Sequence, residues 1–230
     1  MSNFFSNWEK FYRQLTLGAY NYILEGLKNT IIIAILGLII GMLIGSILAI
    51  FKLTSKNKLW GKLLNIFADV YVALFRGVPM IVLLLLFKFG LFPTGNPIII
   101  STIAFGLNSG AYVCEIMRGG ILSVDIGQTE AGRALGLNYV QTMIRIVIPQ
   151  AIKNIIPTLG NEFISLLKET SVVSFVAVTD IKKGFDQIAN STLEFMIPYI
   201  MLALVYLVIV LVATGIVKLI ERRLRAGDRR

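Results

Sequence analysis

Two stretches without a charged side chain, at residues 29–51 and 195–217, constrain the fold of this chain more than any other feature. Each holds roughly 23 residues, whereas about 20 residues of helix cross the hydrocarbon core of a bilayer. In the whole chain, 56% of the residues are apolar and 15% are charged, a balance too hydrophobic for a soluble domain of this size. The sequence therefore predicts an integral membrane protein.

Three further spans are predicted at residues 66–89, 98–118 and 157–178, where charged side chains interrupt the first and the last. Two prolines and a glycine at residues 93–97 mark a turn before the second of these spans. Together with the charge-free stretches, they predict an all-α integral membrane protein. Its expected core is a bundle of five transmembrane helices in a membrane domain at residues 29–220.

The distribution of Lys and Arg predicts the orientation, because cytoplasmic loops carry an excess of these residues. With the C-terminus inside, the cytoplasmic connections hold more than twice as many basic residues as the outside. Residues 221–230 then form a basic cytoplasmic tail, and residues 1–28 form an extracytoplasmic segment without the pattern of a cleaved signal peptide. We expect residues 11–29 to form an amphipathic helix in the membrane interface, which suits their tyrosines.

Metal and nucleic-acid sites are not expected. The chain has no histidine and a single cysteine, Cys114, so it lacks a ligand set for zinc or haem and cannot form an internal disulfide. The net charge is +9, but the basic residues alternate with long apolar stretches and do not gather on one solvated domain. We therefore expect no cofactor on this chain and no nucleic-acid partner.

The connection at residues 119–153 is the longest soluble segment of the predicted topology. A helix is predicted to begin near Thr129, with Glu130 in its first turn, where a carboxylate interacts favourably with the helix dipole by roughly 0.3–1 kcal/mol. Gly136 would end this helix, because glycine adopts the left-handed cap conformation at little cost. Pro149 marks the entry to the next helix. The loop is expected to hold two helices separated by a sharp bend.

This loop resembles the EAA loop of the permease subunits of ATP-binding-cassette (ABC) importers, whose pattern is Glu-Ala-Ala, three residues, Gly, nine residues, Ile, one residue, Leu and Pro. The spacing matches throughout, with Gly132 replacing the second Ala and Ile148 replacing the Leu. Gly132 is expected to destabilise the helix by up to about 1 kcal/mol. In that family the short helix is a coupling helix that sits in a groove of the ATPase subunit. The resemblance implies these ATPase-coupling residues: Glu130, Ala131, Gly132, Leu135, Gly136, Ile146 and Pro149. The alternative is that Glu130 only caps a solvated helix.

Three further segments, at residues 75–79, 111–120 and 166–171, extend the resemblance over nearly the whole chain, toward the polar amino-acid branch of these permeases. The resemblance implies a type I ABC importer fold and a permease that carries a polar amino acid across the bacterial cytoplasmic membrane. It also implies the partners: two copies of an ATPase subunit, a second permease that is an identical or a sister chain, and an extracytoplasmic solute-binding protein. ATP and Mg²⁺ are expected on the ATPase, because this chain lacks a G-x-x-x-x-G-K-[ST] phosphate loop.

Polar side chains inside the predicted spans are candidates for the substrate path, since each Asp, Lys or Arg at the centre of a helix in lipid costs about 2.5–3.5 kcal/mol. In the fourth span, two carboxylates and a serine fall along one stripe of a helix, with a lysine on the neighbouring row. The third span carries an amide and a hydroxyl at its middle. The candidates are Asn108, Ser109, Glu162, Ser165, Lys168 and Glu169.

A structural role is the alternative for several of these charges. Lys168 can pair with a carboxylate on a neighbouring helix or extend to the interface. Glu115 and Arg118, three residues apart, are expected to form a structural pair at the cytoplasmic end of the third span. Arg76 and Pro79 indicate a break in the second span, which is either a kink or a gate.

Two other function classes fit the sequence less well. A secondary transporter driven by an ion gradient is expected to show inverted internal repeats, and an odd number of spans argues against them. A membrane-embedded enzyme needs a nucleophile beside a base or paired carboxylates within hydrogen-bond reach, whereas Glu162 and Glu169 lie roughly 10 Å apart along one helix. The sequence leaves open which amino acid is carried and whether the permease pairs with itself.

Overall fold

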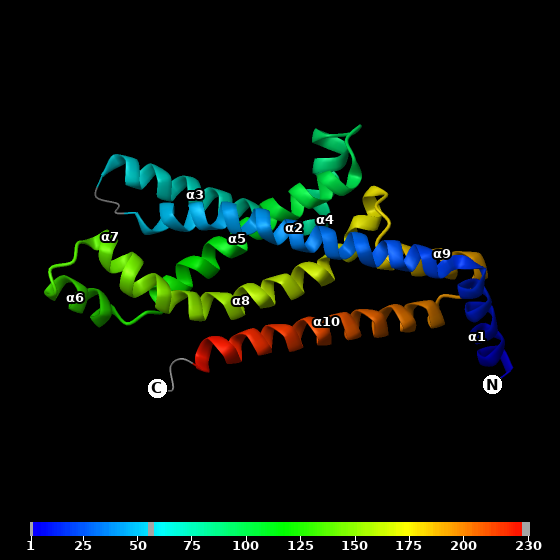
Figure 1. The fold of residues 1–230 in the computed structure, drawn as a ribbon. Helices are drawn as coiled ribbons and strands as arrows, with labels where there is room; N and C mark the ends of the chain where they lie inside the picture. Colours follow the sequence, from blue (N-terminus) through cyan, green and yellow to red (C-terminus); the bar gives the residue numbers. More distant parts are fainter. Residues whose placement is uncertain (1, 55–57, 227–230) are drawn as a thin grey trace. The chain divides into compact units, whose positions relative to one another are not determined.

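The computed structural model describes residues 2–54 and 58–226, and every regular element in these ranges is helical (Figure 1). The all-α class predicted from the sequence is therefore confirmed for this part of the chain. Short π-helical turns occupy Leu15–Ala19, Leu86–Leu91 and Met143–Val147, and a 3-10 turn occupies Thr170–Val176. The α-helices are α1 (Ser2–Gln14), α2 (Tyr20–Leu53), α3 (Leu59–Gly77), α4 (Met80–Leu85), α5 (Pro97–Leu122), α6 (Ile126–Ala134), α7 (Tyr139–Thr142), α8 (Ile148–Glu169), α9 (Ile181–Thr192) and α10 (Met196–Arg225).

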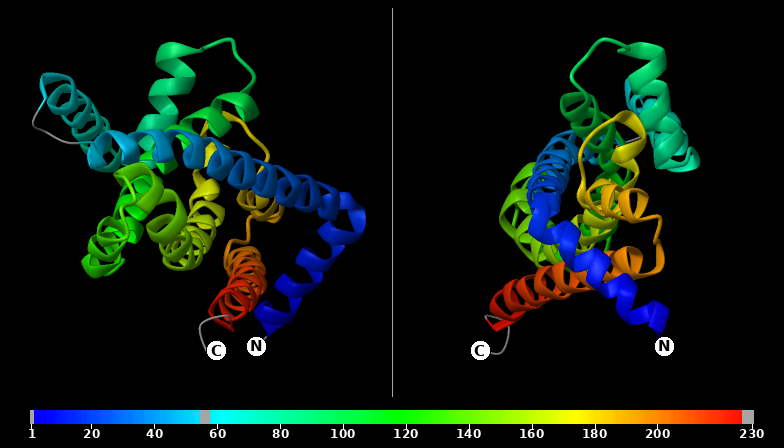
Figure 2. Two further views of the ribbon diagram at one scale, coloured as in Figure 1. Left: turned by 60° about the vertical axis from the view of Figure 1, so that its left-hand side comes forward. Right: turned by 90° about the vertical axis from the view of Figure 1, so that its right-hand side faces the viewer.

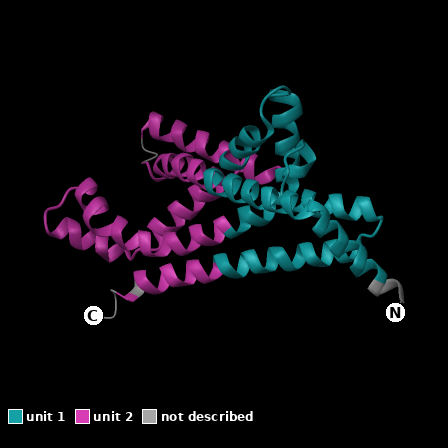
Figure 3. Ribbon diagram, turned by 45° about the vertical axis from the view of Figure 1, so that its right-hand side comes forward, with its two compact units in different colours: residues 1–37, 79–106, 164–213 teal, residues 38–78, 107–163, 214–230 magenta. Residues whose placement is uncertain are grey.

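The chain divides into two compact units, each assembled from three separate segments (Figure 3). The boundaries between the units fall inside the long helices α2, α5, α8 and α10, so each of these helices begins in one unit and ends in the other. Unit 1 comprises Met1–Gly37, Pro79–Gly106 and Ile164–Ala213, and unit 2 comprises Leu38–Val78, Leu107–Phe163 and Thr214–Arg230.

In unit 2, small residues allow α2 and α5 to approach closely. A Cβ added at Gly41 would lie 2.8 Å from the Cβ of Ser109, and one added at Gly45 would lie 2.7 Å from the Cβ of Val113. The two glycines are four residues apart and so share one face of α2. This spacing is typical of membrane helices whose backbones pack against each other, where association depends on close van der Waals contact.

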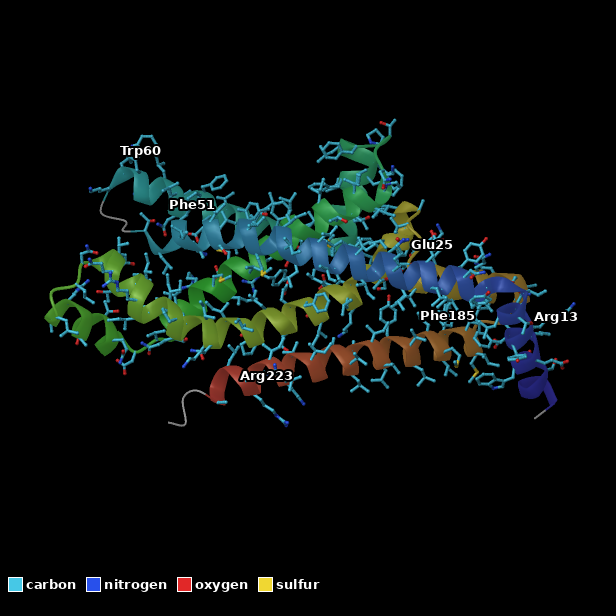
Figure 4. All side chains as sticks on the ribbon, in the orientation of Figure 1. Arg13, Glu25, Phe51, Trp60, Phe185 and Arg223 are labelled. Carbon is cyan, nitrogen blue, oxygen red and sulfur yellow. The ribbon has the colours of Figure 1, made fainter. Side chains whose placement is uncertain are left out.

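An apolar cluster and one amide tie α3 to the end of α2 in unit 2. The cluster of buried residues includes Leu48 and Ala49 of α2 together with Ala68 and Val72 of α3. The Asn65 amide nitrogen on α3 is hydrogen-bonded to the carbonyls of Phe51 at 2.9 Å, Thr54 at 3.1 Å and Gly61 at 2.9 Å. Two of these carbonyls, Phe51 and Thr54, lie at or just past the C-terminal end of α2, so the Asn65 side chain holds this end against α3. Phe51 is labelled in Figure 4, as is Trp60, which projects from the start of α3.

The core of unit 1 forms where α1 and α9 meet. The ring of Phe11 stacks on that of Phe185, which is labelled in Figure 4, with centroids 6.5 Å apart and the planes 8° from parallel. Asp180 caps the start of α9 by accepting a 2.8 Å hydrogen bond from the backbone N–H of Lys183. Burial raises the pKa of the Asp180 carboxyl to about 6, because the low-dielectric surroundings disfavour its charged form.

The N-terminal helix differs from the sequence expectation. The structure has α1 over Ser2–Gln14, and Gly18, with φ of +106°, separates it from α2, which already begins at Tyr20. Figure 2 shows α1 turning away from α2 at this point. The single helix predicted over 11–29 is therefore wrong in its bounds, because a positive φ that glycine readily adopts interrupts it. The interfacial location of the segment stays a prediction.

Three helical stretches are long and apolar enough to cross a membrane: Ser6–Leu53, Pro97–Leu122 and Met196–Leu224. A fourth is obtained among the described residues if Leu59–Gly77 and Met80–Leu91 are counted as one broken span. The predicted span at 157–178, the fourth along the chain, corresponds to α8, which is more polar. The structure thus supports a multi-pass membrane protein, whereas the count of five remains a prediction.

The second and fourth predicted spans differ in detail from the helices observed. The span at 66–89 is two helices, interrupted where Val78 and Pro79 take extended backbone conformations, because a proline disfavours the helical region for the residue before it. The break expected there is thereby confirmed. The span at 157–178 is replaced by α8, which ends at Glu169, followed by the 3-10 turn Thr170–Val176.

Candidate functional site

The cytoplasmic loop of the predicted topology contains a short helix, α6, that begins earlier than expected. Asp125 caps α6 by accepting a 2.7 Å hydrogen bond from the backbone N–H of Gly127, so the helix starts at Ile126. Glu130 consequently lies in the second turn, and the prediction that it sits in the first turn is wrong. Gly136 has φ of +77° directly after the helix end, which confirms its role in ending α6.

The bend after α6 is fixed by a second set of local hydrogen bonds. The backbone N–H of Leu137 donates to the carbonyl of Gly132 at 3.1 Å. Asn138 and Gln141 then form a capping box at the start of α7, in which each side chain accepts from the other's backbone N–H. The expected pair of helices separated by a sharp bend is confirmed, but helical backbone resumes at Tyr139, well before Pro149, the second residue of α8.

Gly132, in the last turn of α6, faces the segment that follows the bend, and there is no room there for a side chain. A Cβ at Gly132 would lie 2.7 Å from Cγ2 and 2.8 Å from Oγ1 of Thr142, and 3.3 Å from Cδ1 of Ile146. Thr142 is fully buried, and its hydroxyl donates to the carbonyl of Asn138 at 3.0 Å. Two of the predicted coupling residues, Gly132 and Ile146, therefore take part in packing within the loop.

The other predicted coupling residues face outward. Glu130, Ala131, Gly136 and Pro149 are exposed, and Leu135 is 77% exposed. Ile126, at the other end of α6, is 75% exposed and escaped the sequence analysis. Two large exposed apolar side chains therefore flank this short, polar helix. An Ile that directly follows an Asp N-cap is a signal that could have identified the second of them.

Contacts within the loop join α6 to the start of α8. The Gln150 amide donates to the side-chain oxygen of Gln128 at 3.1 Å and is hydrogen-bonded to the carbonyl of Ile146 at 3.0 Å. Helical backbone also continues from Tyr139 through the π turn into α8, so the segment after the bend is joined directly to α8.

Two of the six candidate substrate-path residues meet in unit 2. The Ser109 hydroxyl on α5 donates to Oε1 of Glu162 on α8 at 2.9 Å. Ser109 is fully buried, Asn108 beside it is 4% exposed, and Glu162 is half-buried. A carboxylate inside a predicted membrane domain is thus held by a hydrogen bond from a neighbouring helix, which offsets part of its desolvation cost.

The other three candidates lie at the end of α8 in unit 1. Ser165, Lys168 and Glu169 are all exposed. Among the ion pairs of the described residues, none includes Lys168, so the alternative in which it locks the bundle through a salt bridge gains no support. Their part in a substrate path stays a prediction.

A network of four charged groups lies in unit 2 where α2, α3 and α5 meet. Oε2 of Glu115 accepts from Arg118 at 2.9 Å, which confirms the expected pair. The Lys52 ammonium lies 2.6 Å from Oε1 of Glu115 and 2.8 Å from Oδ1 of Asp69. Lys52 and Asp69 were not predicted from the sequence, because their partners are distant in the chain.

Comparison with known proteins gives consistent matches over most of the chain. Residues 41–226 match the family described as binding-protein-dependent transport system inner membrane component. The chain is 36% identical over 223 residues to the arginine transport system permease protein ArtQ of Bacillus subtilis, a match that covers 93% of this chain and 97% of that protein. It is 37% identical to the putative glutamine transport system permease protein GlnP of Rickettsia bellii, covering 88% and 93%.

A solved structure shows the same architecture. The crystal structure of an amino acid ABC transporter with histidines superimposes with a TM-score of 0.83 at 38% sequence identity. The match covers 91% of this chain and 97% of that chain.

Proposed function

Because the chain belongs to the family of binding-protein-dependent transport system inner membrane components, we propose that it is the permease subunit of an ATP-driven importer of a polar amino acid. The family is one of multi-pass inner-membrane subunits that work with an ATPase and a solute-binding protein, and it is not a family of enzymes. Support for an amino-acid substrate comes from relatives named for arginine and glutamine transport. The observation that carries the proposal is the outward-facing surface of α6, at the spacing of an ATPase-coupling loop.

The proposed mechanism is mechanical coupling through α6. A separate ATPase, which binds ATP and Mg²⁺, contacts Glu130 and Leu135. When the ATPase closes on the nucleotide, this contact displaces α6. The hydrogen bond between Gln128 and Gln150 passes this movement to α8. Glu162 on the same helix is bonded to Ser109 of α5, so the movement reaches the polar groups inside the membrane domain.

The proposed assembly contains two copies of the ATPase, a second permease that is an identical or a sister chain, and an extracytoplasmic solute-binding protein. Five spans enclose too little space for a solute path alone, which favours a pair of permeases. The N-terminus is proposed to lie outside and the basic C-terminal tail in the cytoplasm. Asn108, Ser109, Glu162, Ser165, Lys168 and Glu169 are proposed to line the path.

The test uses proteoliposomes that contain all proposed components and measures ATP-dependent uptake of radiolabelled amino acids. Leu135→Glu places a charge in the apolar contact with the ATPase, and we expect uptake to fall by at least about tenfold, since about 1.4 kcal/mol of lost interaction suffices for that factor. Leu59→Glu serves as the matched control, because Leu59 is 71% exposed at the start of α3, outside the loop. Undiminished uptake by Leu135→Glu at normal membrane levels would contradict the coupling role.

A further inference from the structure

Unit 2 contains a cavity of about 440 Å³ that the proposed mechanism does not use. Its walls come from the end of α3, from α5 and the turn after it, and from α8, and its volume is in the range of small-molecule sites. The polar lining residues that matter here are Arg76, Tyr112, Glu115, Ser123, Asn154 and Thr158.

The cavity has an excess of positive charge. The Arg76 guanidinium lies 5.0 Å from the centroid of the Tyr112 ring, and none of the ion pairs among the described residues includes it. Glu115 also lines the cavity, but Lys52 engages its Oε1 and Arg118 its Oε2. The negative charge of Glu115 is therefore already compensated, and the charge of Arg76 is not.

The position of Arg76 makes an uncompensated charge costly. Arg76 is exposed at the last turn of α3, beside the break at Val78 and Pro79 in the predicted second span. An arginine inside a membrane span costs about 2.5–3.5 kcal/mol on insertion scales unless it meets water or an anion. The ring of Tyr112 offsets part of this cost, yet a stacked guanidinium keeps its N–H donors at its edge for a carboxylate.

The remaining polar groups are arranged to leave the cavity open. The Asn154 amide donates to the Ser123 hydroxyl at 2.9 Å, and that hydroxyl donates to the carbonyl of Gly120 at 2.8 Å. A Cβ at Gly120 would clash with Ile155, whereas one at Gly119 would meet no atom within 4 Å. Ile155 therefore packs closely against Gly120 on one side of the cavity, and position 119 borders open space.

We propose that this cavity binds the carboxylate of the transported amino acid, with Arg76 as the anchoring cation and Tyr112 as the platform that orients it. The inference rests on the proposed function and deepens it, since it adds a carboxylate site near the cytoplasmic end of the membrane domain. A phosphate of a lipid headgroup offers related chemistry, and the experiment has to separate the two sources.

The test measures binding to the purified permease–ATPase complex by scintillation proximity. The probe is whichever radiolabelled amino acid the wild-type complex takes up fastest, and its α-amide, which lacks the carboxylate, is the competitor. We expect Arg76→Gln to weaken binding of the amino acid at least tenfold and to leave the affinity for the α-amide unchanged. Arg76→Lys should give an intermediate loss. Arg13→Gln, an exposed arginine on α1, is the control and should bind as wild type does.

A second variant keeps the inference testable if Arg76→Gln fails to fold. Gly119→Val should occupy open space at the cavity and weaken binding of both the amino acid and its α-amide. Wild-type binding by Arg76→Gln, or equal affinity of the wild type for the two ligands, would overturn the inference. So would phospholipid that co-purifies with the wild type but not with Arg76→Gln while amino-acid binding is unchanged, which would assign the site to a lipid phosphate.

The two proposals fail in different ways. A wild-type complex without ATP-dependent uptake overturns the proposed function and the inference with it. A wild type that transports together with an Arg76→Gln variant that transports equally fast overturns the carboxylate site alone.

Discussion

Gly132 stands where the coupling-loop pattern has alanine, and its surroundings explain the difference. The neighbouring side chain is Thr142, whose Cγ2 and Oγ1 would both lie within 2.8 Å of a new Cβ. From the sequence alone, Gly132 is expected only to weaken the helix, because glycine has a low helix propensity. The structure shows that its small size permits the sharp bend between α6 and α7.

Gly132→Ala is expected to impair coupling although it restores the family pattern. Overpacking of this kind typically costs about 1–3 kcal/mol, so ATPase stimulation by the solute-binding protein should fall several-fold or more. The double variant Gly132→Ala with Thr142→Ala removes both crowding atoms and should recover most of the stimulation. Equal activities of the single variant and the wild type would show that the bend tolerates a methyl group.

Residues that act locally in the chain were predicted well, and residues that act across it were not. The pair of Glu115 and Arg118 follows from helical spacing, and the left-handed Gly136 follows from the preference of glycine for a helix end. Lys52 lies 63 positions from Glu115, and no local pattern brings the two together. Arg76 was assigned to a break in the helix, but its ring contact with Tyr112 depends on tertiary packing.

At the scale of elements, the contact between α2 and α5 depends on the absence of single side-chain atoms. A Cβ added at Gly45 would lie only 2.7 Å from the Cβ of Val113 across this contact. A Cβ added at Gly215 on α10 would have no atom within 4 Å. The same substitution should therefore have different effects at the two sites, although both glycines lie within helices.

Gly45→Ala is expected to lower the stability of the permease by about 1–3 kcal/mol, because the added methyl group pushes the two backbones apart. Gly215→Ala is the matched control and should be neutral or slightly stabilising, since alanine favours the helix by up to about 1 kcal/mol. Thermal unfolding in detergent measures both. A Gly45→Ala protein that melts with the control would refute the close packing.

The helices were predictable where the sequence carries a single strong signal. The first charge-free stretch lies within α2 and the second, except for its first residue, within α10, and the turn before α5 is where the prolines and the glycine indicate it. The predicted helix bounds were wrong where weak local conformational preferences of the residues compete. Gly18 interrupts an otherwise amphipathic stretch, and α8 begins nine residues before Pro157, which is accommodated inside the helix.

For the whole molecule, the uneven distribution of basic residues is the feature that determines orientation. Arg222 and Arg223 follow the last apolar stretch on α10, and Arg223 projects from the end of this helix in Figure 4. Moving such a cluster across the membrane is costly, so the C-terminal end is expected to stay in the cytoplasm.

Single cysteines at Glu9 and Glu221 test this orientation. In intact cells, a membrane-impermeant maleimide should label Glu9→Cys, whereas Glu221→Cys should react only after permeabilisation. The native Cys114 is fully buried and should contribute little background. The reverse labelling pattern would invert the predicted topology and place α6 on the wrong side for a cytoplasmic ATPase.

The unbroken helical backbone from Tyr139 to Phe163 has a consequence for how far a small push can reach. At 1.5 Å per residue, the part of α8 at residues 148–163 is roughly 24 Å long, so tilting it by about 5° would move its far end by about 2 Å. Asn154 and Thr158 lie on the same helix and form part of the cavity wall beside Arg76. A movement at the cytoplasmic end of α8 would therefore change the shape of this cavity and the position of Glu162 at the same time.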